Sequence, residues 1–127
     1  MSFPFNPRQG LVLVGAELAG PSGTSVLRLA LDTGATGTLI NAAMLVSIGY
    51  DPALEPERLQ ITTGSGVEFV PRLKLSKISA LGQVRENFPV LCHTLPPTAS
   101  VDGLLGLDFL RGQVLNLDLR AGTIRLE

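Results

Sequence analysis

Three residue types that often carry chemistry are scarce in this 127-residue sequence, which has no tryptophan, one cysteine (Cys92) and one histidine (His93). A single cysteine cannot form an internal disulfide, and one cysteine with one histidine is too small a ligand set for a His/Cys zinc site. We therefore expect a protein that uses neither a metal ion nor a cofactor.

An excess of charge is also lacking, since the formal net charge is -1 and no run of five like charges occurs. This argues against a nucleic acid or an anionic membrane surface as the partner. No apolar run reaches 18 residues, and the N-terminus lacks a basic start followed by an apolar stretch. We therefore expect no membrane association and a cytoplasmic location.

Short apolar runs separated by turn-forming residues make up the chain. Hydrophobic residues account for 45%, with 9 prolines and 14 glycines between the runs. Because residues with strong strand preference dominate these runs, we expect a mostly β fold. Length and the absence of repeats or linkers predict a single domain over residues 1–127.

Particular segments predict the elements. Two runs, Leu11 to Leu18 and Ser25 to Leu31, flank the turn-forming quartet at 20–23 and predict an antiparallel hairpin. Asn41 is placed to cap a short helix that runs through Ile48 and ends at Gly49.

Two further stretches alternate as strands do. The alternation from Val67 to Leu75 predicts a half-buried strand whose apolar face carries Val67, Phe69, Leu73 and Leu75. Pro71 on that face predicts that the strand lies at an edge or is bulged there. Residues 115–126 predict a terminal hairpin whose apolar side chains are Leu115, Leu117, Leu119, Ile124 and Leu126.

An acid directly follows an apolar run at Leu29-Ala30-Leu31-Asp32-Thr33-Gly34-Ala35-Thr36. A buried carboxylate needs donors, and a tight turn of small residues lets backbone N–H groups approach it. Asp32 can equally be an ordinary turn residue, because aspartate favours turns on its own account.

A second signal lies downstream, where Val101 to Leu110 begins as a buried strand, breaks at Gly106 and continues with helical spacing. Two apolar residues and a glycine, Leu104-Leu105-Gly106, can pass beneath a tight loop. Asp102 is read as a loop-holding carboxylate and Asp108 as a cap of the last helix.

These two segments, in this order, resemble the retropepsin branch of the aspartic peptidases, in which Asp-Thr/Ser-Gly after a strand is followed by two hydrophobic residues and a glycine. The resemblance implies a closed, barrel-like acid-protease fold with one or two short helices. It implies a catalytic Asp32, a Thr33 that braces the two active-site loops, a Gly34 that lets substrate approach, and support of the loop by Leu104, Leu105 and Gly106. The flap that closes over substrate would have its tip at Thr63, Gly64, Ser65 and Gly66.

The sequence departs from the family pattern at two places. Retroviral enzymes often have an arginine where Leu107 follows Gly106, so their intersubunit ion pair is not expected here. Tyr50, the only tyrosine, comes too early in the chain to be the flap tyrosine of pepsin-like enzymes.

Asp-Thr-Gly occurs once, whereas the chemistry needs two acids close enough to share a proton. We therefore expect a homodimer that shares an Asp dyad and hydrolyses an extended peptide or protein substrate through an activated water, with the terminal hairpin joining the subunits. A Ser-His-Asp triad is disfavoured because His93 is the only base, and adjacent Cys92 and His93 would point to opposite faces of a strand. An inactive peptide-binding dimer of the same fold and a purely structural β domain remain as alternatives.

Overall fold

The computed structural model describes residues 1–64 and 66–127. Its elements follow in chain order: β1 (Ser2–Pro4), β2 (Leu13–Gly20), β3 (Gly23–Leu31), β4 (Leu39–Asn41), α1 (Ala42–Ser47), the 3-10 helix η1 (Pro52–Leu54), β5 (Arg58–Thr63), β6 (Gly66–Ala80), β7 (Gln83–His93), β8 (Gly103–Leu105), α2 (Leu107–Leu110), β9 (Leu115–Asp118) and β10 (Thr123–Leu126).

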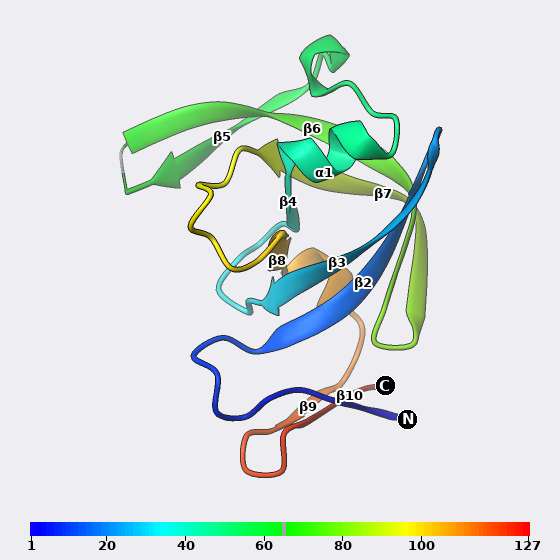
Figure 1. The fold of residues 1–127 in the computed structure, drawn as a ribbon, viewed down its shortest axis with the longest axis vertical. Helices are drawn as coiled ribbons and strands as arrows, with labels where there is room; N and C mark the ends of the chain where they lie inside the picture. The colour runs from blue at the N-terminus through cyan, green and yellow to red at the C-terminus, as the bar shows by residue number, and fades with distance from the viewer. Residues whose placement is uncertain (65) are drawn as a thin grey trace.

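Six strands form a closed ring in the order β2-β3-β8-β4-β7-β6, and the ring closes because β6 also pairs with β2. Strand β5 pairs with β6 outside the ring, so the long β6 belongs both to the barrel and to a projecting hairpin (Figure 1). The prediction of a mostly β, barrel-like fold with one or two short helices is confirmed.

The hairpin of β2 and β3 shows why the barrel wall forms. Val14, Ala16 and Leu18 alternate with exposed neighbours and are buried. The turn is short, since Gly20 pairs directly with Gly23. Only glycine fits at position 20, because a Cβ there would lie 2.4 Å from the Ile48 carbonyl oxygen. The predicted hairpin is therefore present, with its buried face inside the barrel.

Helix α1 begins and ends where the sequence predicts, but for a partly different reason. Asn41 is the N-cap residue, yet its side chain makes no capping hydrogen bond. Its backbone instead belongs to β4, and its N–H donates to the Asp102 carbonyl oxygen at 2.8 Å. Gly49 ends the helix with a φ of +101°, a conformation that glycine adopts without strain.

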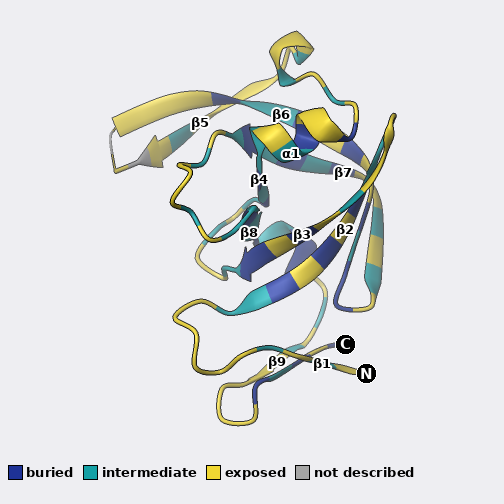
Figure 2. Cartoon of the chain, in the orientation of Figure 1, coloured by how far each residue is buried: buried dark blue, intermediate teal, exposed yellow. Residues whose placement is uncertain are grey.

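Strand β6 corrects a prediction. Val67 and Phe69 are 57% and 66% exposed, whereas Val70 is buried with Leu73 and Leu75. The inward face changes because β6 pairs with β5 up to Pro71 and with β7 only from Arg72 onward. Pro71, which has no N–H to donate, lies where no β7 partner faces it. The first part of β6 is thus one strand of a projecting arm (Figure 2).

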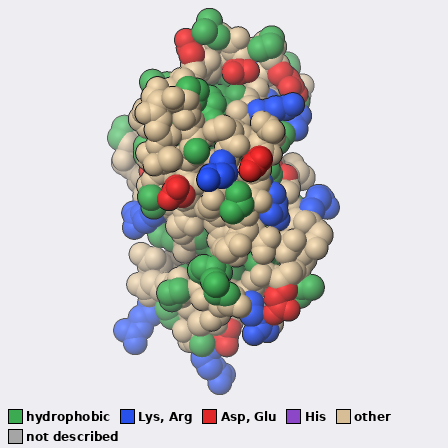
Figure 3. Space-filling view, turned by 90° about the vertical axis from the view of Figure 1, so that its right-hand side faces the viewer, with side chains coloured by type: hydrophobic (Ala, Val, Ile, Leu, Met, Phe, Trp, Pro, Cys, Tyr) green, Lys and Arg blue, Asp and Glu red, His purple; other side chains and the backbone are tan. Residues whose placement is uncertain are grey.

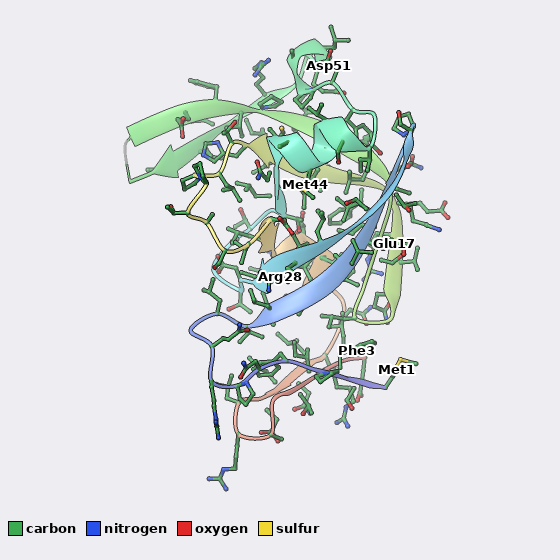
Figure 4. The ribbon with its side chains drawn as sticks, in the orientation of Figure 1. Met1, Phe3, Glu17, Arg28, Met44 and Asp51 are labelled. Atoms are coloured by element: carbon green, nitrogen blue, oxygen red, sulfur yellow. The ribbon has the colours of Figure 1, made fainter. Side chains whose placement is uncertain are left out.

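The chain ends form a separate sheet, ordered β1-β10-β9, beneath the barrel (Figure 1). Ile124 and Leu126 are buried in the core of their own chain, and Phe3 rises from β1 to pack beside them (Figure 4). Two residues of the expected apolar hairpin face, Ile124 and Leu126, are thus buried within their own chain, and pairing of the hairpin's edge with a second subunit stays a prediction. The sheet's polar face carries Asn116 and Arg125, a directly opposed pair.

Acidic and basic side chains are interspersed on the face of the molecule seen in Figure 3. None of the helices in the described residues is long and apolar enough to cross a membrane.

Candidate active site

Asp32 is held in place by backbone groups. The chain leaves β3 at Leu31, and the Asp32 N–H donates to the Leu105 carbonyl oxygen at 3.0 Å. The Oδ1 atom of Asp32 accepts the Gly34 N–H at 2.8 Å. Within the described residues Oδ2 accepts no hydrogen bond, and the residue is half-buried. One carboxylate oxygen is therefore fixed while the other is open to water or to a ligand.

The turn rests on the segment that follows β8. A Cβ on Gly106 would lie 2.8 Å from the Gly37 carbonyl and 2.9 Å from the Ala35 oxygen, so the two backbones can approach only because residue 106 is glycine. The Leu107 N–H donates to that same Ala35 oxygen at 2.8 Å. Leu105 is fully buried, but Leu104 points the other way, into the cleft described below. Leu105 and Gly106 thus lie beneath the loop, whereas Leu104 does not.

Thr38 and Asp108 form a buried lock that the sequence did not reveal. The Thr38 hydroxyl donates to Asp108 Oδ1 at 2.7 Å, and the Thr38 N–H donates to Oδ2 at 3.0 Å. The same hydroxyl accepts the Gly106 N–H at 3.1 Å. Asp108 does accept the Phe109 N–H in helix α2, but its main partners lie on the Asp32 loop. A threonine at the end of a loop gives no signal of burial, because alternation begins only with the strand after it.

Asp102, the other nearby acid, has a structural partner as well. Its Oδ2 atom accepts the Arg28 N–H at 2.9 Å, and its own N–H donates to the Arg28 carbonyl oxygen at 2.8 Å. Arg28 lies on β3, where Figure 4 labels it. Asp102 therefore fastens the segment before β8 to β3, as the loop-holding interpretation expects.

A cleft of about 580 Å³ opens beside the Asp32 loop. Its floor is the outer face of β8, β4 and β7, because Leu39 pairs with both Leu91 and Leu104 and their side chains share one face of the sheet. The opposite face carries Ile40 and Cys92 into the core. The remaining lining comes from the loop at 34–37, from β5 at 60–62 and from Leu95, Ala99 and Val101.

The β5–β6 hairpin overhangs this cleft. Its tip lies on the same side of the molecule as the loops at 32–38 and 94–102 (Figure 1). Thr63 pairs with Gly66, and a Cβ on Gly64 would meet nothing within 4 Å. Gly66 has a φ of +123°, which explains a glycine there. The fourth residue of the expected flap tip, Ser65, lies outside the described residues.

Cys92 and His93 point to opposite faces of β7. Cys92 is a buried core residue, and burial raises the pKa of its thiol while the positive charge of Arg58 acts in the other direction. His93 points away from the core, as expected, but into the cleft, which sequence reasoning did not foresee. The two side chains therefore cannot act as nucleophile and base for each other.

The aspartyl protease family model matches residues 14–109. A retropepsin-like aspartic protease from Rickettsia conorii has a similar structure, with a TM-score of 0.73 at 17% identity over 99% of this chain and 88% of that one. The EIAV protease, solved with the inhibitor HBY-793, has a TM-score of 0.60 at 18% identity over 86% of this chain and 92% of its own. No curated protein sequence matches.

The two structural matches confirm the predicted retropepsin fold. The family model spans the segment that contains Asp32-Thr33-Gly34, the projecting hairpin, and Leu104-Leu105-Gly106. The chain belongs to the aspartyl protease family.

Proposed function

We propose that this protein is an aspartic endopeptidase that is active as a homodimer. The observation that carries the proposal is the state of the three acids near the cleft. Asp32 has a free carboxylate oxygen at the end of β3, whereas Asp102 accepts the Arg28 N–H and Asp108 is bound to Thr38. Of these three acids Asp32 is thus the one left for chemistry, and the hydrogen bonds of Asp102 and Asp108 disfavour either of them as its partner.

A two-fold dimer supplies the missing acid as Asp32 of a second copy. In that arrangement Thr33, which is exposed on the same turn, braces the opposite loop. In the terminal sheet β10 is the central strand, so β1 and β9 are the edges that can pair with the second copy. Ile124 and Leu126 of β10 are already used in the chain's own core.

Catalysis in this proposal needs no covalent intermediate. One carboxyl of the dyad is protonated and the other is ionised, since two close carboxylates do not both ionise readily. The ionised group takes a proton from a shared water, which attacks the scissile carbonyl carbon as the other group donates its proton to the carbonyl oxygen.

The substrate is an extended peptide or protein segment. Leu39, Leu91 and Leu104 form an apolar floor, and Gly34 leaves room beside Asp32 for a substrate backbone. The unpaired Cys92 is compatible with a reducing compartment, and we propose that the enzyme works in the cytoplasm.

Replacing Asp32 with asparagine tests the proposal. The amide has nearly the same shape but cannot cycle a proton, so we expect kcat on a peptide library to fall by at least about 100-fold. Asp51→Asn, which changes an exposed acid that caps η1, is the matched control and keeps its activity. Cleavage by Asp32→Asn at the rate of the wild-type protein contradicts the proposal. Peptide binding without cleavage by the wild-type protein indicates a binding scaffold instead.

A further inference from the structure

Strands β6 and β7 separate beside the cleft. They pair from Ala80 and Gln83 as far as Arg72 and Leu91, and beyond that point β6 continues with β5 as the projecting arm. Strand β7 instead runs on to His93, which pairs with Asn41 of β4. The fork between them holds a cavity of about 480 Å³.

One ion pair spans this fork. His93 Nε2 lies 3.7 Å from Glu68 Oε2, with side-chain exposures of 24% and 45%. The ion pair between Arg72 and Glu57, by contrast, joins β6 to the residue before β5 and stays within the arm. The His93–Glu68 pair connects the free part of the arm to β7.

His93 lines the cleft, and Glu68 lies on the hairpin that overhangs it. His93 lies on the cleft side of β7, two residues beyond Leu91 on the same face. Glu68 is directly opposite Ile61 in the hairpin, and Ile61 lines the cleft from above. The pair therefore connects β7, which forms part of the cleft floor, to the hairpin above the cleft. It does so at a place where the backbone hydrogen bonds between β6 and β7 have ended.

We propose that Glu68 and His93 are positioning residues whose ion pair holds the β5–β6 hairpin over the cleft. Calling that hairpin a substrate flap rests on the proposed function, but the ion pair itself does not. Both partners are charged only when the imidazole is protonated.

The charges around the fork are few. Glu68 faces the imidazole from β6, and β5 contributes Arg58, whose positive charge acts on the adjacent Cys92 thiol. Partly exposed ion pairs of this kind are weak, so the expected effect is a shift in how often the arm opens, by about two- to fivefold.

Amide hydrogen exchange tests the positioning role without any need for catalysis. In Glu68→Gln, we expect amides at 59–62 and 67–70 to exchange about two- to fivefold faster than in the wild type at pH 5.5, after correction for intrinsic rates. Glu86→Gln, an exposed acid on β7, is the matched control and leaves exchange unchanged.

A double variant and a kinetic measurement complete the test. Glu68→Gln with His93→Gln should exchange no faster than either single variant, and both single variants should raise KM at pH 5.5 with kcat unchanged. Equal exchange in Glu68→Gln and the wild type, or faster exchange that spreads over 72–80, overturns the inference. Failure to detect any Asp32-dependent cleavage contradicts the proposed function only, since the exchange result stands by itself.

Discussion

Thr38 connects three parts of the site with a single hydroxyl group. It is fully buried, donates to Asp108 and accepts from Gly106, so the loop after Asp32 is fastened both to helix α2 and to the end of β8. Because Gly106 is buried, its N–H finds no water to replace the Thr38 hydroxyl if that acceptor is lost.

Thr38→Val keeps the shape of the side chain and removes the hydroxyl. We expect the free energy of unfolding to fall by about 1–3 kcal/mol, since the Gly106 N–H loses its acceptor and Asp108 loses a donor. Urea denaturation measures this change. Thr36→Val, at an exposed position two residues earlier, is the control and should change stability by less than about 0.5 kcal/mol. Equal losses in the two variants contradict the lock.

At this scale the sequence predicted the tight turn around Asp32 better than the contacts that hold this turn in place. Asp32 stood out because an acid followed an apolar strand, and both the carboxylate's contact with Gly34 N–H and the approach of Gly106 follow from small residues in tight turns. The sequence does not predict the contact between Thr38 and Asp108, because the two residues lie 70 positions apart and their contact depends on how two loops meet.

In the proposed function, access of substrate to the cleft depends on the β5–β6 hairpin, whose residues 60–62 line the cleft. Gly64 and Gly66 both flank its tip, but they differ as sites for substitution. Gly66 has a φ of +123°, which proline cannot adopt, so Gly66→Pro would disturb the strand itself. Gly64 is not among the residues with positive φ, and it has open space around it.

Gly64→Pro therefore stiffens the tip with little distortion of the fold. We expect kcat/KM to fall several-fold, because substrate capture needs the tip to move, while the free energy of unfolding changes by less than about 0.5 kcal/mol. Gly10→Pro, in the loop before β2, is a control at another glycine with open space around it. Unchanged turnover in Gly64→Pro shows that a different element covers the cleft.

The same hairpin shows where pattern reading ends. Alternation correctly found a strand from Val67 onward, yet it placed Val67 and Phe69 in the core. Periodicity cannot tell that a strand exchanges one partner for another at Pro71, because this exchange depends on the closure of the barrel. Helix α1 shows the reverse case, in which the bounds were right although Asn41 makes no side-chain cap.

At the scale of the whole molecule, the shared dyad makes a prediction about mixtures. Wild-type chains are dissociated and reassociated with about a ninefold excess of Asp32→Asn chains, so that nearly every wild-type chain pairs with a variant chain. Activity per wild-type chain should then fall about tenfold, because a mixed dimer holds one working acid.

The control mixture contains the same excess of Asp51→Asn chains and should keep full activity per active site. Activity that scales simply with the amount of wild-type chain, or an active species that sediments as a monomer, contradicts the shared dyad. Asp102 and Asp108 would then have to be tested as second acids within one chain, despite their present hydrogen bonds to Arg28 and Thr38.

The contacts that shape the Asp32 turn also decide when it can form. Thr38 meets Gly106 and Asp108 across 68 and 70 residues of chain, and β8, which lies beside β3, is made late in synthesis. Such long-range pairing is slow, because the entropy of closing a large loop is lost before any contact stabilises the closed chain. A growing chain on the ribosome therefore carries Asp32 on an unsupported loop until residues 103–108 have emerged and folded, so the proposed peptidase cannot become active before then.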